Sequence, residues 1–411
     1  MSITVPESPA AHAEERGETD GEASAWVLFH PLDVVTFRDG RPFTTGMTAT
    51  AHTTLPRPTS TGGALRTVFG SNPLRITGPV LVRTGGPRAR VLLPAPADLV
   101  VDDRVPRRLR LHEHPGEDAG ADLFLPAGVE SDLDFRAAEP GGLGFLTGAG
   151  EPSGAYLSSE ALTGYLDGDP SRALEHLEAS AAGTSAAGTS SAGGRRQEPL
   201  VRESRLGIAR HARSSRDGAG RTTLPGFLYQ ADFWRPSETG DGNATGSAGV
   251  AFGCRVWFRS AVPEPVVTVV RLGGEARQAA VTVVSGGAGL PALPKAPERF
   301  PDGRVLLYLA TPAVFRDGWL PELPDGARLR GACTLGPEVI TGIDGDSQRG
   351  RPLRWAVAAG SVYFLEFDDP AEAEVFARKA HGECLPQMQD RTGPKNWMRT
   401  VGFGLCLVGR W

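Results

Sequence analysis

The chain has 411 residues, a formal net charge of -5, and charged side chains at 22% of its positions. This length allows two or three domains with a substantial core, and the composition is that of an ordinary globular protein. The net charge excludes a protein that coats nucleic acid through a strong overall positive field, although a local basic groove is compatible with it.

Arginine dominates the basic residues, because only three of the 43 are lysines. The planar guanidinium fork suits phosphates and bases better than an ammonium group does. A GC-rich coding sequence would produce the same bias without any functional reason. The composition therefore leaves both explanations open.

The cysteines and the N-terminus exclude further classes of protein. Cys254, Cys333, Cys384 and Cys406 lie far apart without a CxxC pair, which argues against a zinc knuckle and a disulfide framework. The first 20 residues are acidic and lack the apolar core of a signal peptide, and no apolar run approaches a membrane span. We expect a cytoplasmic protein with no membrane contact, no metal and no cofactor.

Residues 1–23 are acidic and poor in apolar side chains, which predicts a disordered tail. Residues 24–101 predict a first globular module. Its order of strand, helix, strand, strand is the first part of a ferredoxin-like split βαβ unit. The predicted elements are a buried strand at Trp26–Phe29, a helix at Ser60–Phe69 with a hydroxyl cap from Pro58–Ser60, and strands at Ile76–Val82 and Ala89–Val101.

Cations gather in the loop and the helix of this first module. Arg38 and Arg41 flank an Asp-Gly turn, and Arg66 lies in the predicted helix. A strand followed by a basic loop and a helix N-terminus can offer guanidinium forks and backbone N–H groups to phosphates. This segment is therefore a candidate phosphate-binding site.

Residues 102–200 predict an insertion with little regular structure, apart from a helix at Ser158–Leu177. Residues 179–194 within it consist of Ala, Gly, Ser and Thr. Such a low-complexity linker cannot bury apolar area and should be mobile.

A basic arm is predicted at residues 201–249. Arg195–Arg221 carries eight arginines against three acids. Apolar anchors on both sides allow a hairpin whose tip, Arg213–Gly220, would carry arginines into a partner. Arg205 and Arg210 are the candidate contacts, although a solvated loop would also explain this composition.

Residues 250–411 predict a C-terminal module rich in strands. A helix at Pro370–His381 has acidic residues in its first turn, where they favour the helix dipole. The predicted strands are Val250–Arg259, Val266–Leu272, Ala279–Val284, Val305–Ala310, Leu353–Val357 and Ser361–Phe367.

The C-terminal segment is a second candidate site. From Arg391 onward it contains no acidic side chain, and Lys395 and Arg399 precede a short strand that is punctuated by Gly402, Gly404 and Gly409. Because glycine lacks a Cβ, such a loop lets backbone amides approach a phosphate or a base closely. A tight turn before an edge strand would need the same glycines.

No catalytic motif is complete in the sequence, so we expect a protein that is not an enzyme. Residues 345–350 are one residue too long for the G-x-S-x-G elbow, and the histidines at 112 and 114 do not form HExxH. His30 and His52 could each supply a general base. A capping or core role is the more ordinary explanation for either histidine.

Several short motifs of the sequence, in the same order, resemble motifs of the RAMP superfamily. As a set they resemble the third subunit of the type III-B (Cmr) CRISPR effector, although Ala358 stands where proline is usual. The matching words are PLDVVTFRDGRPF at 31–43, PTSTGGALR at 58–66, ESRLGI at 203–208 with GFLY at 226–229, LGGEAR at 272–277, TPAVF at 311–315 with GWLP at 318–321, AGSVY at 359–363, and the glycine-rich C-terminal segment.

This resemblance implies an α+β protein of two ferredoxin-like (RRM-like, βαββαβ) RAMP modules with a large insertion and a C-terminal glycine-rich loop. It implies a non-catalytic RNA-binding subunit that grips the 5′ repeat-derived tag of the crRNA in antiviral defence. The implied partners are the large polymerase-like subunit and a backbone RAMP subunit. The expected RNA-binding residues are Arg38, Arg41, Arg66, Arg205, Arg210, Lys395, Arg399, Gly402, Gly404 and Gly409.

Two alternatives stay open at this point. A RAMP endoribonuclease that processes CRISPR repeat RNA could use His30 or His52 as its general base. In a protein scaffold that touches no RNA, the same motifs would serve packing alone.

Overall fold

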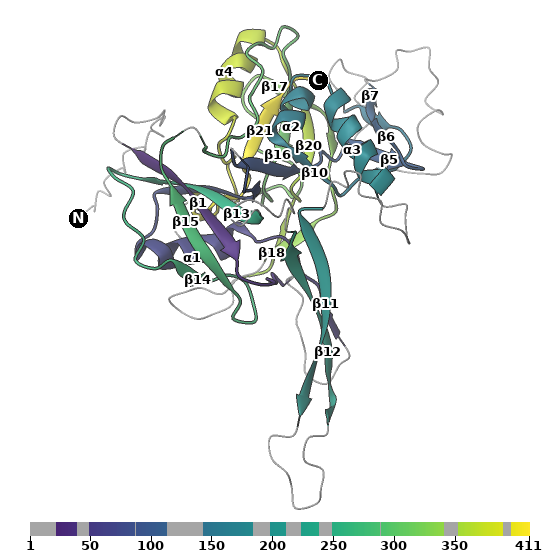
Figure 1. The fold of residues 1–411 in the computed structure, drawn as a ribbon. Coiled ribbons are helices and arrows are strands. Elements are labelled where there is room, and N and C mark those ends of the chain that lie inside the picture. The colour runs from purple at the N-terminus through teal and green to yellow at the C-terminus, as the bar shows by residue number, and fades with distance from the viewer. Residues whose placement is uncertain are drawn as a thin grey trace, which may run out of the picture.

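The computed structural model describes residues 22–38, 49–86, 88–112, 143–183, 198–210, 223–237, 249–287, 289–340, 352–388 and 396–411. The fold is of mixed α and β structure, and its sheets are mostly antiparallel. Two larger sheets form the body of the molecule, and a long hairpin projects from it (Figure 1).

The first sheet draws its strands from both halves of the chain. All of its pairings are antiparallel, and a strand of the second half, β13, lies between two strands of the first half. In spatial order the strands are β10 (Tyr156–Ser158), β4 (Arg90–Pro94), β3 (Arg75–Arg83), β13 (Val250–Phe258), β1 (Ala23–Pro31), β15 (Gln278–Val284) and β14 (Val269–Arg271).

The second sheet is built entirely from the C-terminal part of the chain. Its pairings are also antiparallel. In spatial order the strands are β17 (Ala327–Cys333), β20 (Val362–Phe367), β16 (Arg304–Leu309) and β21 (Cys406–Gly409).

The side chains of each sheet alternate between two buried clusters, as the period of two in a strand requires. Val27 and Phe29 pack with helix α1 (Pro58–Phe69), whereas Trp26 and Leu28 belong to a cluster that also holds residues of the second sheet. The far face of the second sheet packs against helix α4 (Pro370–Ala380). The body therefore has four layers in the order α1, first sheet, second sheet, α4 (Figure 1).

Smaller elements cover the edges of these layers. Helices α2 (Ser159–Leu166) and α3 (Ser171–Gly183) lie beside the small strands of the insertion, and α5 (Trp397–Val401) packs on α1 and β3. The short strands are β2 (Ala49–Ala51), β5 (Leu99–Asp102), β6 (Val105–Arg108), β7 (Arg110–His112), β8 (Phe145–Thr147), β9 (Glu151–Pro152), β18 (Glu338–Ile340) and β19 (Arg354–Ala356).

Most strands predicted from alternation are present, but the predicted division of the chain at residue 250 is not followed by the sheets. β13, β14 and β15 complete the first sheet rather than the second. β13 is apolar on both faces because it fills the gap between β1 and β3. The tail predicted to be disordered, at 1–23, lies almost wholly outside the described residues.

Three helical predictions need correction. The first turn of α1 has no side-chain cap: its N-cap is Arg57, and Pro58 starts the helix with the φ angle that a first turn needs. The helix predicted at 158–177 is two helices, since Asp167–Pro170 separates them, and Ser158 caps the first. α3 extends to Gly183, so the first residues of the predicted linker are helical.

The ferredoxin-like prediction is not confirmed. Four strands of the first sheet follow the order β15-β1-β13-β3, and the second sheet follows β21-β16-β20-β17, so each has its first and third strands adjacent at the centre. A ferredoxin-like unit has two helices. Within the described residues, no helix joins β13 to β15 in the first sheet, and none joins β16 to β17 in the second.

His381 lies directly after α4 and contacts the last strand of the second sheet. Its Nε2 lies 2.8 Å from the carbonyl oxygen of Pro294, so Nε2 carries the proton, and Nδ1 accepts a 3.0 Å hydrogen bond from the backbone N–H of Val408. Burial lowers the pKa of His381 below its ordinary value.

We expect the free energy of unfolding to fall as the pH drops below about 6.5, where the unfolded chain takes up a proton that the folded His381 resists. His381→Asn should lose this part of the pH dependence. Urea unfolding of both proteins between pH 7.5 and 5.5 measures the difference. Parallel curves for the two proteins would exclude this role for His381.

Candidate nucleic-acid interface

A two-stranded arm projects from the body of the molecule (Figure 1). β11 (Leu200–Arg210) and β12 (Thr223–Pro236) pair antiparallel from Leu200↔Pro236 to Arg210↔Thr223. The hairpin predicted for this segment is therefore confirmed. Its predicted tip lies outside the described residues.

The base of the arm is fixed to the opening segment of the chain. β2 pairs parallel with β12, and Val35 and Trp234 exchange two backbone hydrogen bonds of 2.9 and 2.7 Å. The indole Nε1 of Trp234 donates to the carbonyl oxygen of Thr54 at 2.8 Å. These contacts hold the arm against the segment that leads into α1.

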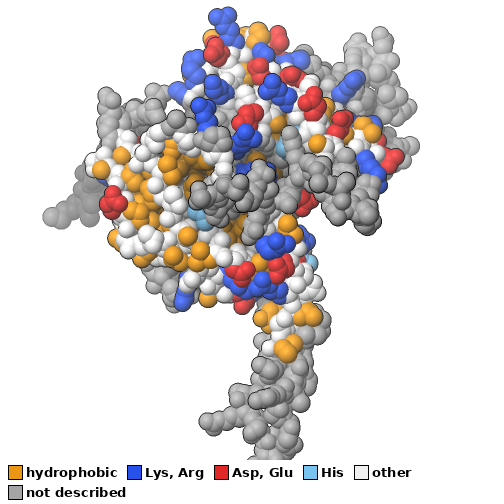
Figure 2. Space-filling model, in the orientation of Figure 1, with side chains coloured by type: hydrophobic (Ala, Val, Ile, Leu, Met, Phe, Trp, Pro, Cys, Tyr) orange, Lys and Arg blue, Asp and Glu red, His pale blue; other side chains and the backbone are white. Residues whose placement is uncertain are grey.

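Charged side chains of both signs gather at this base (Figure 2). Asp33 lies 3.1 Å from Arg277 and 3.8 Å from Arg205. Glu203 lies 2.8 Å from Arg205 and 3.4 Å from Arg235. The cluster joins the segment after β1, the arm and the turn after β14.

Phe233 is the aromatic centre of this cluster. Its ring is buried, and the guanidinium groups of Arg205 and Arg277 lie 5.3 and 4.9 Å from its centroid. Such cation–π contacts stabilise by roughly 0.5–2 kcal/mol each. Arg205, a predicted RNA contact, is therefore partly engaged within the protein.

Asp232 joins the two sides of the arm base to β2. Its carboxylate accepts hydrogen bonds from the hydroxyl of Ser204 and, at 3.1 Å, from Nδ1 of His52. Burial acts to raise the pKa of Asp232, but the hydrogen bonds from Ser204 and His52 outweigh it and leave the pKa below its ordinary value. The carboxylate is thus ionised at neutral pH and orients the half-exposed His52 ring.

The two faces of β11 differ in exposure. Arg202, Leu206 and Ile208 lie on the exposed face, and the guanidinium of Arg202 lies 5.4 Å from the Trp234 ring centroid. Leu206 and Ile208 are 72% and 51% exposed. The arm therefore presents a cation and two large apolar side chains to solvent on one face.

The opposite face of β11 shows why the motifs ESRLGI and GFLY contain a glycine and a tyrosine. Gly207 pairs with Tyr229, and a Cβ at Gly207 would overlap the Tyr229 ring. The glycine of ESRLGI and the tyrosine of GFLY are therefore one cross-strand pair, in which the ring covers the glycine.

The other predicted arginines occupy two neighbourhoods. Arg38 forms a backbone bridge with Thr53 at the arm base and its side chain is exposed. Arg66 on α1 and Arg399 on α5 are exposed on adjacent helices, and the Nε of Arg399 donates to the carbonyl oxygen of Cys384 at 2.7 Å. Arg41, Lys395 and the side chain of Arg210 lie outside the described residues.

The glycines of the C-terminal segment are buried, and protein atoms fill the space beside them. A Cβ at Gly402 would overlap the carbonyl oxygen of Gly78, one at Gly404 would overlap Gln387, and one at Gly409 would lie 2.6 Å from the carbonyl oxygen of Leu166. The predicted open glycine surface for RNA is therefore not present. The glycines instead allow the C-terminal segment to pack closely against β3, Gln387 and α2.

The motifs TPAVF and LGGEAR also serve packing within the protein. The hydroxyl of Thr311 donates to the carbonyl oxygen of Gly402 at 2.7 Å and accepts from the N–H of Leu405 at 2.8 Å. Gly273 lies against the carbonyl oxygen of Thr36, and the N–H of Gly274 donates to that oxygen at 2.8 Å. TPAVF thus holds the terminal segment, and LGGEAR holds the opening segment and brings Arg277 to the arm.

Sequence reasoning missed Arg202, Phe233, Trp234 and Arg277 as members of the interface. The signal available was the mixture of aromatic and basic residues at 233–235 and 202–205, but the pairing between the two strands was needed to interpret it. Within the described ranges, no group of three His, Cys, Asp or Glu side chains could hold a metal ion. None of the described helices combines the length and apolar character that crossing a bilayer requires.

Comparisons with known proteins identify the family. Residues 27–411 match the family described as CRISPR-associated protein (Cas_Cmr3). No curated protein matches the chain. Among solved structures, one match is a cryo-EM structure of the type III-B Cmr-beta bound to cognate target RNA and AMPPnP, at 14% identity and a TM-score of 0.43, covering 82% of this chain and 86% of that chain.

A second match is the type III-B Cmr-beta bound to cognate target RNA, at 13% identity and a TM-score of 0.41, with the same coverage of both chains. The family match extends over nearly the whole chain and confirms the resemblance seen in the sequence motifs. The chain belongs to the Cas_Cmr3 family of CRISPR-associated proteins.

Proposed function

We propose that this chain is a non-catalytic RNA-binding subunit of a type III-B CRISPR effector and grips the 5′ repeat-derived tag of the crRNA. The observation that carries the proposal is the projecting arm, with its exposed Arg202, Leu206 and Ile208. The two sheets with their first and third strands adjacent would then be two RRM-like modules of a RAMP protein, each reduced to one helix.

The chemistry of the arm suits a single strand of RNA. Guanidinium groups bind phosphates, and apolar side chains can stack against or wedge between unstacked bases. The charged cluster at the arm base keeps Arg205 and Arg277 within the protein, so that the exposed Arg202 is the cation of the arm best placed for phosphates. The overall negative charge makes such local cations the main source of affinity.

The family also supports a place among other subunits. In this proposal the chain docks the large polymerase-like subunit and a backbone RAMP subunit in the cytoplasm and acts in antiviral defence. Co-expression of the effector subunits with a guide, followed by size exclusion, tests this assembly. If the chain elutes apart from both subunits and the guide, the proposed assembly is wrong.

Removing a phosphate contact on the arm should weaken RNA binding in a salt-dependent way. We expect Arg202→Ala to lower the affinity of the full chain for single-stranded repeat RNA and to reduce the slope of log K against log salt by about 0.7–1. Filter binding between 50 and 300 mM salt measures both quantities.

Arg316→Ala is the matched control, because Arg316 is 86% exposed on a turn of the second sheet. Its affinity and salt slope should equal those of the wild type. An unchanged slope in Arg202→Ala would remove Arg202 from the interface. If the wild-type chain neither binds the RNA nor crosslinks to the guide in the assembled effector, the protein is a scaffold and the proposal is wrong.

One observation favours a second candidate function, a repeat-processing endoribonuclease. His52 has its Nδ1 bound to the ionised Asp232 and is half exposed, which is how a general base is oriented. Incubation of the full chain with repeat RNA in EDTA tests it. Specific cleavage that His52→Ala abolishes would establish the nuclease, whereas intact RNA would leave His52 a positioning residue of β2.

A further inference from the structure

The unbalanced charge of the chain lies in its first 22 residues. They hold six acidic residues and one arginine, and the resulting net charge of -5 equals the formal net charge of the whole chain. Residues 23–411 are therefore balanced in charge. The family match begins at residue 27, so this acidic segment precedes the part that the family shares.

Arginines surround the point where the acidic segment joins β1. The structure describes the chain from Glu22, and the carboxylate of Glu22 lies 3.7 Å from Nε of Arg75. Arg255 donates a 3.2 Å hydrogen bond to the hydroxyl of Ser24. The last carboxylate of the acidic segment is therefore in contact with a cation of the first sheet.

Trp257 holds both of these arginines in place. The guanidinium groups of Arg75 and Arg255 lie 3.8 and 4.8 Å from the centroid of its ring. The carboxylate of Glu383 lies 2.6 Å from a terminal nitrogen of Arg75. Because these side chains are already ordered, little conformational entropy is lost when a further anion binds them.

Two exposed arginines extend this group of cations. The strand partner of Ala23 is followed directly by Arg259, at the same end of the first sheet. Arg399 on α5 donates from Nε to the carbonyl oxygen of Cys384 at 2.7 Å, and Cys384 is next to Glu383 in the chain. Arg399 therefore lies close to the ion pair of Arg75.

The effect on Cys384 supports this proximity. Burial and Glu383 raise the pKa of its thiol, whereas Arg399 and Arg75 both act to lower it. Both guanidinium groups are thus near this residue. The arginine cluster that begins at Glu22 consists of Arg75, Arg255, Arg259 and Arg399.

This cluster keeps a positive charge when its own acids are counted. Glu22 and Glu383 offset two of its four positive charges. α5 itself contains no acidic residue, and the chain from residue 391 onward contains none either. The surface is therefore complementary in charge to the segment that ends on it.

We propose that the acidic segment docks on the arginine cluster through its carboxylates and screens these arginines from other polyanions. Glu18 and Asp20 precede Glu22 by four and two residues. An extended chain spans at most about 3.6 Å per residue, so both carboxylates lie within roughly 15 Å of Glu22. Attachment through so short a connection keeps their effective concentration in the millimolar range, which favours docking within one chain.

Screening has a consequence for nucleic acid. Phosphates and carboxylates bind guanidinium groups in the same way, so the docked segment competes with the phosphates of RNA at this cluster. This consequence rests on the proposed function, whereas the docking itself does not.

Limited trypsin digestion of the full chain tests the docking. Trypsin cleaves after Arg16, which lies within the acidic segment, and mass spectrometry of the released residues 1–16 gives the initial rate. At 50 mM salt we expect this rate to be about fivefold lower than in a free peptide of residues 1–24. At 300 mM salt the difference should fall below twofold, because salt screens contacts between exposed charges.

Two sets of variants locate the contact. Arg259→Ala combined with Arg399→Ala should restore cleavage to within about twofold of the free peptide at 50 mM salt, whereas Arg316→Ala, an exposed arginine of the second half, should leave the protection unchanged. Neutralising the segment with Glu14→Gln, Glu15→Gln, Glu18→Gln and Asp20→Asn should also remove the protection, measured against a peptide of the same altered sequence.

Cleavage of the wild type at the rate of the free peptide at both salt concentrations would overturn the docking. Protection that persists at 300 mM salt or in both sets of variants would also overturn it, because the body would then merely obstruct the protease.

Binding of labelled uniform oligouridylate of ten nucleotides at 50 mM salt tests the screening. The chain with the neutralised segment should bind about threefold more tightly than the wild type. Equal affinities would overturn the screening of RNA. Failure of both proteins to bind would instead overturn the proposed function together with its screening, and the trypsin result would still decide the docking.

Discussion

Gly402→Ala should lower the free energy of unfolding by about 2–6 kcal/mol. Gly402 has a φ angle of 111°, which an L side chain rarely adopts, and placing another residue there costs about 1–3 kcal/mol. A Cβ at this position would also overlap the carbonyl oxygen of Gly78 on β3. Because the opposing atom belongs to the backbone of a central strand, relief requires a shift of α5 or of the sheet, with a further cost of about 1–3 kcal/mol.

Two glycines serve as matched controls for this substitution. Gly63 lies in α1, and a Cβ added there would have no neighbouring atom within 4 Å, so Gly63→Ala should stabilise the chain by about 0.5–1 kcal/mol through helix propensity. Gly289 also has open space beside it, and Gly289→Ala should be nearly neutral. Urea unfolding followed by tryptophan fluorescence measures all three.

The same experiment separates packing from RNA contact at the C-terminal segment. If Gly402→Ala unfolds at the wild-type urea concentration but binds RNA much more weakly, the glycine contacts RNA and the packing explanation is wrong. A loss of stability with wild-type affinity under conditions where the variant is still folded would support packing as its only role.

Local patterns were sufficient to predict elements whose side chains alternate or recur in one segment. A continuous apolar run predicts a buried strand at Trp26–Phe29, and alternation with the apolar side chains on one side predicts the strand at Val250–Arg259; both are central strands. The hairpin of the arm followed from apolar anchors on both sides of a basic stretch. These signals arise from neighbouring residues and need no knowledge of the fold.

The elements that escaped prediction depend on partners distant in sequence. β17 reads ARLRGAC, and its alternation breaks at a bulge between Leu329 and Gly331, where the buried Arg330 lies 3.1 Å from Glu366 on the adjacent β20. The insertion of β13 between β1 and β3 is likewise set by pairing across the chain.

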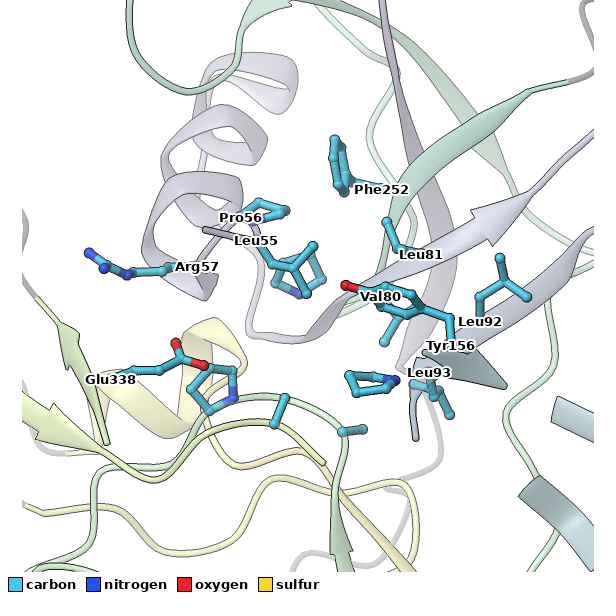
Figure 3. Close-up of a pocket in the computed structure, with 15 residues that line it drawn as sticks. Leu55, Pro56, Arg57, Val80, Leu81, Leu92, Leu93, Tyr156, Phe252 and Glu338 are labelled. Carbon is cyan, nitrogen blue, oxygen red and sulfur yellow. The ribbon is translucent and has the colours of Figure 1, made fainter. Parts of the chain in front are cut away.

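The candidate site shows the same limit. Glycine at 402 and 404 indicates that another group lies close to the backbone at these positions. Only the fold shows that these groups are Gly78 and Gln387 rather than a ligand. A pocket beside the start of α1 is lined by Arg57, Tyr156 and Glu338, which come from three separate parts of the chain (Figure 3). No spacing in the sequence could have signalled it.

Asp98→Ala is expected to destabilise the chain by about 3–5 kcal/mol. The Asp98 carboxylate is fully buried, lies 2.8 Å from the Nε of Arg108 and accepts a 2.6 Å hydrogen bond from the hydroxyl of Tyr165. The three side chains come from the turn before β5, from β6 and from α2, so they fasten the insertion to the core. Without the carboxylate, a largely buried guanidinium and a fully buried phenol lose their partner.

Three further variants define the origin of this loss. Asp368→Ala breaks an ion pair with Arg328 of similar geometry, at 2.6 Å, but both side chains are about half exposed, so it should cost no more than about 1 kcal/mol. Tyr165→Phe removes only the hydroxyl and should cost about 1–3 kcal/mol. Asp98→Asn keeps an acceptor for Tyr165 and should fall between Tyr165→Phe and Asp98→Ala.

A double variant decides whether the unpaired charge causes the loss. In Asp98→Ala combined with Arg108→Ala, no guanidinium remains without its carboxylate, so the total loss should be smaller than the sum of the two single losses by at least about 1 kcal/mol. Urea unfolding at pH 7 gives the four free energies of this cycle. Strict additivity, or a loss in Asp98→Ala no larger than that of Asp368→Ala, would show that the buried network does not hold the insertion to the core.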